Sequence, residues 1–126
     1  MADYKVPMRD IHFNLFELFD YESHYQGIPQ YADTGTDLVS AILDESAKFC
    51  ENVIAPLNQS GDAEGCTLEN DVVTTPKGFK EAYQQFVEAG WPSLSHDTDY
   101  GGQGLPPSLG TVINELTGSA NWSWSM

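Results

Sequence analysis

The chain has 126 residues, of which 40 % are hydrophobic and 12 % aromatic, enough for one domain with a modest core. Five Lys and Arg against 19 Asp and Glu give a formal net charge of −14, which excludes nucleic acid and anionic membrane surfaces as partners. Two cysteines are too few for a disulfide scaffold, no apolar run approaches the roughly 20 residues that span a bilayer, and the first residues lack the features of a signal peptide. We therefore expect a protein of the reducing cytoplasm with no membrane insertion.

The first predicted element is a short helix over residues 10–20. Ile11, Leu15 and Leu18 lie at helical spacing, and Asp10 can cap the first turn. The stripe is rich in Phe and cannot be buried by one helix alone, so this helix must dock on the rest of the protein or on a partner. Residues 21–31 contain three tyrosines, a Gly and a Pro, which predict an irregular crossing. We assign residues 1–34 to an amino-terminal helix and irregular extension.

A long helix after residue 34 is the strongest element that the sequence predicts. Thr34 or Thr36 can cap its start. Pro56 lacks an N–H group and would clash with the carbonyl of Asn52, so the helix must kink or end there. The apolar arc is wide enough for packing on two sides, and it comprises Leu38, Val39, Ile42, Leu43, Cys50, Val53, Ile54 and Leu57.

The middle of the chain predicts a loop, a ribbon and a third helix. Residues 58–70 are glycine-containing and polar, as in a solvated loop. Residues 72–74 can form a short extended piece paired with Thr67 and Leu68, although so short a ribbon is marginal on its own. Thr75 is the expected cap of the next helix, with Pro76 in the first helical position and Gly90 as its end.

The last predicted helix runs from Pro107 into Trp122 and Trp124. It meets no cap, glycine or charged tail before Met126, which predicts that this helix is cut and that the chain is a fragment. The expected fold is all-α: a small bundle of four helices, partly orthogonal, with at most one very short β-ribbon. The helical domain itself spans residues 35–126.

A glycine loop, Tyr-Gly-Gly-Gln-Gly-Leu-Pro at residues 100–106, precedes that last helix. No Lys follows Gly104 anywhere in the chain, so the loop is not a phosphate-binding P-loop. A dinucleotide fingerprint that starts at Gly102 has Pro107 where its third glycine belongs, and no strand precedes it. On these grounds the loop predicts a tight structural turn that leads into a helix.

Other catalytic and metal motifs also fail. A calcium loop counted from Asp62 lacks the required Gly and Glu. Ser95, His96 and Asp97 are neighbours in one loop and cannot form a triad, whose members meet across a fold. The three histidines lie far apart without metal-ligand spacing, so we expect no metal site. Cys50 lies in the apolar series of the long helix and is expected to fill core space.

Taken together in order and spacing, four stretches resemble the amino-terminal helical domain of acyl-CoA dehydrogenases: residues 52–57 with Asp62 after them, 79–83, 89–91 and the loop at 100–106. The sequence is most similar to the methylmercaptopropionyl-CoA dehydrogenase subgroup, whose members carry an early helix like residues 9–13. The resemblance covers nearly the whole chain, and the Tyr-Gly-Gly-x-Gly loop is its most specific part.

The resemblance implies a flavoprotein oxidoreductase of fatty acid metabolism in its complete form. Such a protein has a β-domain and a second helical domain after this one, holds FAD at their junction, and oxidises an acyl-CoA thioester to the 2,3-enoyl-CoA. Its electrons pass to an electron-transfer acceptor, and a homo-oligomer in the bacterial cytoplasm is expected. The glutamate base and most flavin contacts belong to the later domains, so this chain supplies no catalytic residue, binds no FAD by itself and is inactive alone.

The resemblance also implies which residues form part of the substrate pocket: Tyr100, Gly101, Gly102, Trp122, Trp124, Ser125 and Met126. Two tryptophans at i and i+2 of a helix cannot both face one core, so one of them is free to face a cavity. Such bulky side chains shorten a pocket, which predicts short or thioether-sized acyl groups. The alternative from another class is a free-standing acidic helical interaction module that uses its aromatic end for docking.

Overall fold

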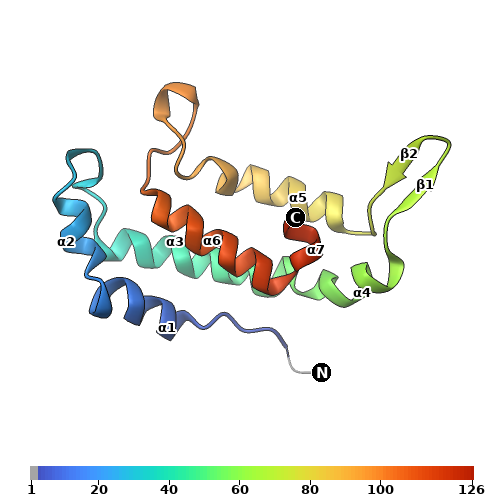
Figure 1. Cartoon of the computed structure of the whole chain (residues 1–126), viewed down its shortest axis with the longest axis horizontal. Helices are drawn as coiled ribbons and strands as arrows, with labels where there is room; N and C mark the ends of the chain where they lie inside the picture. The colour runs from blue at the N-terminus through green and yellow to red at the C-terminus, as the bar shows by residue number, and fades with distance from the viewer. Residues whose placement is uncertain (1–2) are drawn as a thin grey trace.

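The computed structural model describes residues 3–126, so Met1 and Ala2, the first two residues of the expected extension, lie outside the described part. Two long helices form its centre, α3 (Thr36–Phe49) and α6 (Pro107–Ala120). They run side by side in the same direction, with α1 (Met8–His12) along one side and α5 (Phe79–Glu88) along the other (Figure 1). The all-α prediction with one short ribbon is confirmed.

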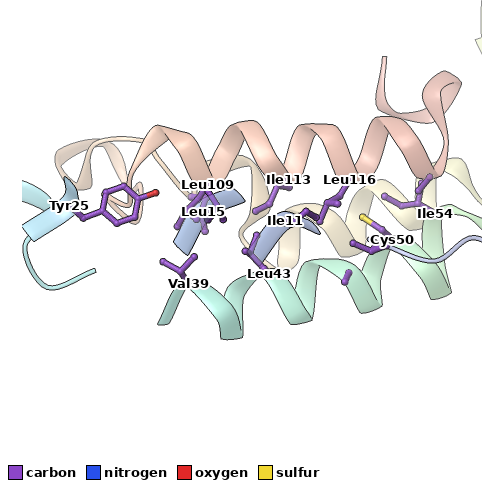
Figure 2. Close-up of a cluster of buried hydrophobic side chains, with 14 residues drawn as sticks. Ile11, Leu15, Tyr25, Val39, Leu43, Cys50, Ile54, Leu109, Ile113 and Leu116 are labelled. Atoms are coloured by element: carbon purple, nitrogen blue, oxygen red, sulfur yellow. The ribbon is translucent and has the colours of Figure 1, made fainter. Parts of the chain in front are cut away.

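The core lies between α3, α6 and the amino-terminal helix (Figure 2). Leu43 and Cys50 come from the α3 side, Leu109 and Leu116 from α6, and all four side chains are at most 1 % exposed. Burial of one such Leu contributes roughly 1.5–3 kcal/mol. The remaining buried apolar residues of the cluster are Val6, Ile11, Leu15, Tyr25, Val39, Ala47, Ile54, Leu94, Ile113 and Ala120.

The first helix begins at Met8, earlier than expected, and continues from α1 into a π-helical segment, η1 (Phe13–Leu18). Asp10 therefore lies inside the first turn, and the cap position is Pro7, without a side-chain cap. Ile11 and Leu15 are buried in the common core, as the docking prediction required, whereas the exposed fraction of Phe13 is 48 %.

The prediction of an irregular crossing over residues 21–31 is wrong. This segment contains the helix α2 (Tyr21–Gln26) and a 3₁₀ turn, η2 (Pro29–Tyr31). Asp20 makes the difference, because it adopts the left-handed conformation (φ 47°) and its carboxylate accepts the backbone N–H of Ser23. Asp tolerates this conformation better than most residues and is a preferred cap.

Helix α3 begins at Thr36, but neither Thr34 nor Thr36 caps it through its side chain. The carboxylate of Glu22 on α2 accepts the Thr36 backbone N–H at 3.2 Å. A carboxylate at a helix amino terminus is favourable for both hydrogen bonding and the helix dipole, so a residue distant in sequence replaces the expected local cap.

Pro56 bends the long helix without ending it. The turn before it is a π-helix, η3 (Cys50–Ile54), in which the N–H of Ala55 donates to the carbonyl of Cys50 at 2.8 Å. This wider turn accommodates the missing donor of Pro56, and α4 (Pro56–Glu64) follows at once. The solvated loop expected from residue 58 is therefore wrong for its first half. Gly61 explains the packing there, because a Cβ atom on it would lie 2.5 Å from the ring of Phe79.

The predicted ribbon is confirmed as a hairpin of β1 (Thr67–Glu69) and β2 (Val72–Thr74). The strands are antiparallel with Thr67 opposite Thr74 and Leu68 opposite Val73. Asn70 and Asp71 both have positive φ, as a two-residue type I′ turn requires. All six strand residues are exposed, and the hairpin projects from the body (Figure 1).

Two helix boundaries near the carboxyl end also differ from the expectation. Helix α5 begins at Phe79, not Pro76, after Gly78 in a positive-φ conformation, and Thr75 does not cap it. Its end at Gly90 is confirmed (φ 81°). Helix α6 begins at Pro107 as predicted but ends at Ala120. Asn121 is extended and starts a separate short helix, α7 (Trp122–Ser125), so the two tryptophans do not continue α6.

Candidate functional site

The glycine loop is the tip of a segment that folds back on itself. The segment holds two 3₁₀ turns, η4 (Trp91–Ser93) and η5 (Thr98–Tyr100). Three backbone hydrogen bonds join its two arms, from Gln103 to the carbonyl of Ser93, from Gly104 to that of His96, and from Leu105 to that of Leu94, at 2.9–3.0 Å. The loop is thus a closed and braced turn, which confirms the structural reading of its sequence.

The loop needs its glycines for two different reasons. A Cβ atom on Gly102 would lie 2.1 Å from the carbonyl oxygen of His96, far shorter than any van der Waals contact between the two atoms. Gly101 has open space around it but a φ of 83°, which favours glycine. Beside them the Tyr100 side chain is 90 % exposed. The loop therefore presents one aromatic ring on a rigid backbone.

The other expected site residues lie in α7 or directly after it, and the two tryptophans of this helix point in different directions. The indole of Trp124 packs at right angles to Phe86, with 5.5 Å between ring centroids, and lies 6.4 Å from Phe49. Its N–H donates to the carbonyl of Phe79 at 3.1 Å. Trp124 thus joins α7 to α5 and to the end of α3, as an internal member of an aromatic cluster.

Trp122 points the other way, and its exposed fraction is 67 %. It lines a surface hollow of about 500 Å³ between α4 and α7, which we call the α7 hollow, together with Asn58, Gln59, Asp62 and Ser123. The prediction that one tryptophan packs inward and the other is free to face a cavity agrees with this arrangement. Four of the five lining residues have polar side chains and the hollow is open to solvent, so by itself it lacks the dry, enclosed walls that an acyl chain requires.

The seven expected pocket residues form two separate groups. Tyr100, Gly101 and Gly102 lie before the start of α6, and Trp122, Trp124, Ser125 and Met126 lie after its end (Figure 1). Helix α6 has 14 residues, which at 1.5 Å per residue separates the groups by about 21 Å. The structure brings the members of each group together but does not bring the two groups together.

Sequence reasoning missed Asn121, which holds α7 in place. This side chain is 1 % exposed. Its carbonyl oxygen accepts the Trp124 backbone N–H at 3.1 Å and the Ser123 hydroxyl at 3.0 Å, and its amide N–H donates to the carbonyl of Ile54 at 3.4 Å. An Asn directly before an aromatic run is a cap signal, and it could have indicated a new helix at residue 122.

Two ionisable groups beside the core have shifted pKa values. Burial raises the pKa of the Cys50 thiol to about 11, which fits the expected role of this cysteine as core filler. Glu51 next to it accepts from the Lys5 ammonium at 2.8 Å and from the Val6 backbone N–H at 2.9 Å. These two bonds, the Lys5 bond first, hold the pKa of Glu51 below its usual value and fix the amino-terminal segment against η3.

Residues 3–126 do not by themselves form a binding site for a metal ion or for a flavin. No group of three His, Cys, Asp or Glu side chains lies together there. The hollows near α7 offer Lys5 as the cation for a flavin pyrophosphate, and Lys5 already pairs with Glu51. These residues therefore do not by themselves fit FAD. Across the same residues, no helix combines the length and apolar character needed to cross a membrane.

The fold and these sites define an acidic helical domain that displays aromatic groups at both ends of one long helix. No family model matches the chain. It is 41 % identical over 98 % of its length to a 3-methylmercaptopropionyl-CoA dehydrogenase of Ruegeria pomeroyi. It is 36 % identical over 70 % of its length to a butyryl-CoA dehydrogenase of Syntrophomonas wolfei, and 27 % identical over 96 % to a broad-specificity linear acyl-CoA dehydrogenase of Mycobacterium tuberculosis.

The chain spans 21 % of the first of these relatives, 20 % of the mycobacterial one and 15 % of the butyryl-CoA dehydrogenase. The resemblance to acyl-CoA dehydrogenases is therefore confirmed, and the chain corresponds to the amino-terminal part of these longer proteins.

Proposed function

We propose that the whole protein to which this sequence belongs is an FAD-dependent acyl-CoA dehydrogenase that oxidises an acyl-CoA thioester to the 2,3-enoyl-CoA. The identity of 41 % over almost the entire chain to a 3-methylmercaptopropionyl-CoA dehydrogenase carries this proposal. The described residues supply no catalytic base in it, and most of the flavin contacts come from outside them. Electrons leave to an electron-transfer acceptor, and the enzyme is a homo-oligomer of the bacterial cytoplasm.

In this proposal the chain contributes part of the acyl-pocket wall. Trp122 and Met126 support it best, because their side chains are 67 % and 85 % exposed at one end of the domain and offer apolar surface to an opposing wall. Trp124 and Ser125 act behind them by fixing the short helix α7, in which the hydroxyl of Ser125 donates to the carbonyl of Trp122. Tyr100 on the braced turn, with Gly101 and Gly102, forms a second patch that meets another part of the substrate.

The bulk of Trp122 leads to a preference for short or thioether-sized acyl groups. An indole at the far wall fills the volume that a longer chain would need. Replacement of Trp122 by alanine is therefore expected to move the preference towards longer chains. We also propose a boundary at residue 34. Residues 1–34 form an extension, and two of its side chains, Ile11 and Leu15, lie in the core of the domain 35–126.

The activity test uses the complete product of the reading frame that contains this sequence. We expect a bound flavin whose visible absorbance bleaches on addition of butyryl-CoA or 3-methylmercaptopropionyl-CoA without oxygen. Enoyl-CoA should form in equal amount, measured by mass spectrometry. A product with no flavin, or with a flavin that no acyl-CoA reduces, would overturn the proposal.

The wall assignment is tested by the ratio of kcat/KM for an eight-carbon to a four-carbon acyl-CoA. The Trp122→Ala enzyme should raise this ratio at least tenfold over the unchanged enzyme. Phe13→Ala is the matched control, because it also removes an exposed aromatic ring, 48 % exposed, but from η1. An equal ratio in both variants would show that Trp122 is not part of the pocket wall. It would not contradict the proposal that the whole protein is an acyl-CoA dehydrogenase.

A further inference from the structure

A third hollow lies where η1 turns into α2. Helix α2 is well separated from α7 (Figure 1). It has a volume of about 210 Å³ and is lined by Phe19, Tyr21 and His24, which we call the aromatic corner. Asp20 lies between Phe19 and Tyr21 in the left-handed conformation (φ 47°), at the junction of η1 and α2. None of these three rings has a role in the function proposed above.

Tyr21 stands at nearly right angles to Phe19 on one side and to His24 on the other, and we call the hollow that the three rings line an open box. The ring centroids of Phe19 and Tyr21 are 6.3 Å apart with an angle of 81° between their planes, and those of Tyr21 and His24 are 5.8 Å apart with an angle of 83°. Tyr21 is the shared wall, and it rests on Tyr25, which is 2 % exposed. Phe19 remains 63 % exposed, so the box is accessible from solvent.

The surroundings of the corner are anionic. From Asp10 to Ala47 the sequence contains eight Asp or Glu residues and no Lys or Arg. Asp20 and Glu22 flank Tyr21 directly in the chain. Both carboxylates accept backbone N–H groups, from Ser23 and Thr36, and these bonds hold them in place beside the chain of the corner. The potential at the box is therefore negative and attracts cations.

Perpendicular aromatic walls in a negative field select one class of cation. The faces of aromatic rings attract positive charge, and rings arranged as a cage are the usual receptors of quaternary ammonium groups. A metal ion or primary ammonium is strongly hydrated and needs oxygen ligands aimed at it, whereas a quaternary ammonium sheds its water readily and offers methyl groups to the rings. A zwitterion such as a betaine would also bring a carboxylate into this anionic region.

We propose that the aromatic corner binds a small organic cation with a quaternary ammonium head, of the choline type. The volume of the hollow suits such a head group and not a folded partner. The attraction is a cation–π interaction with Phe19 and Tyr21, with His24 as the third lining residue, strengthened by the carboxylates of Asp20 and Glu22. This binding is independent of the acyl-CoA reaction, because it requires neither α7 nor the glycine loop.

The test compares choline with 3,3-dimethylbutan-1-ol, a neutral molecule of the same shape, on the 126-residue chain. Binding is followed by amide chemical shifts at constant ionic strength, with sodium chloride as the balancing salt, so that attraction to the net charge cancels. We expect saturable choline shifts centred on residues 19–24, at least tenfold weaker binding of the neutral analogue, and weaker binding of glycine betaine than of choline. Equal binding of choline and the neutral analogue, or choline shifts spread over the whole acidic surface, would overturn the proposal.

Two variants sharpen the result. Phe19→Leu and Tyr21→Leu keep apolar bulk but remove a ring face, and each should weaken choline binding at least fivefold. Tyr83→Leu is the matched control, because Tyr83 is 59 % exposed on α5, and it should leave the affinity unchanged. Far-UV circular dichroism checks the fold of each variant. An affinity unchanged by both corner variants would refute the site, and the comparison of choline with its neutral analogue needs no variant at all.

Discussion

Replacement of Asn121 by alanine tests how α7 is held on the body of the protein. The change removes the cap of α7, which is worth about 0.5–2 kcal/mol. It also leaves the carbonyl of Ile54 without its side-chain donor, at a cost of roughly 1 kcal/mol, because that bond is long at 3.4 Å and a buried acceptor without a partner costs about 1–3 kcal/mol. Together we expect a loss of about 2–3 kcal/mol in the free energy of unfolding.

The assays are urea unfolding, for the free energy, and thermal unfolding, for Tm, each followed both by far-UV circular dichroism and by tryptophan fluorescence. For a chain of this length, a loss of that size lowers Tm by roughly 8–15 °C. The fluorescence should also change in the native baseline, because Trp124 loses its fixed place between Phe49 and Phe86. Asn121→Ser keeps an acceptor for the cap and should recover about half of the loss.

Asn114→Ala is the matched control, since Asn114 is exposed on α6 and its replacement by Ala favours the helix slightly. If Asn121→Ala and Asn114→Ala differ by less than about 0.5 kcal/mol, the buried amide does not hold α7 and the reasoning fails.

Three further predictions concern the loop, the thiols and the amino-terminal ion pair. Gly102→Ala should open the glycine loop and make it sensitive to chymotrypsin-like and broad-specificity proteases, whereas Gly101→Ala should cost only about 1 kcal/mol from its positive φ. One thiol per chain, the exposed Cys66, should react quickly with a disulfide reagent at pH 8, and Cys50 should react only after unfolding, because it is buried and its pKa is about 11. Glu51→Gln should lower Tm at pH 7, and its difference from the unchanged chain should disappear as the pH falls below the ordinary glutamate pKa of 4.5.

Each of these three predictions can be contradicted by a specific result. Equal proteolysis of the two glycine variants would mean that the contact with His96 does not close the loop. Two fast thiols would show that the helix around Cys50 opens readily. The sign for Glu51 follows from its lowered pKa: a carboxylate favoured in the folded state stabilises above its unfolded pKa and loses this effect when it is protonated. A Tm difference for Glu51→Gln that persists in acid would therefore place the cause elsewhere.

The elements that local chemistry decides could be predicted from the sequence. The hairpin at residues 67–74, the stop at Gly90 and the start of α6 at Pro107 each depend on the backbone preference of one or two residues. The predictions were wrong where a residue distant in the sequence determines the local structure. Thr36 looked like a cap, but Glu22 from the preceding helix accepts its N–H. Residues 58–64 looked like a loop, because their helix depends on Gly61 packing against Phe79.

The candidate site was predictable only in part for a similar reason. The opposite directions of Trp122 and Trp124 follow from their spacing, and the structure agrees. Their distance from Tyr100 depends on where α6 ends, and this is set by Asn121, whose amide reaches back to Ile54 across 67 positions of the chain. The aromatic corner depends in the same way on the left-handed backbone of Asp20.

The π turn at Cys50–Ile54 carries a consequence for the register of the chain. Such a turn has the form of an α-helix with one extra residue, and each residue rotates an α-helix by about 100°. Deletion of one exposed residue there, Asn52, should convert the turn to ordinary α-helix and rotate α4 by that angle. Gly61 would then turn away from Phe79, and Asn58 and Gln59 would leave the α7 hollow. A single residue thus sets the rotation of α4 about its axis, and with it one wall of that hollow. Relatives without the π turn should show a one-residue gap at this position in an alignment.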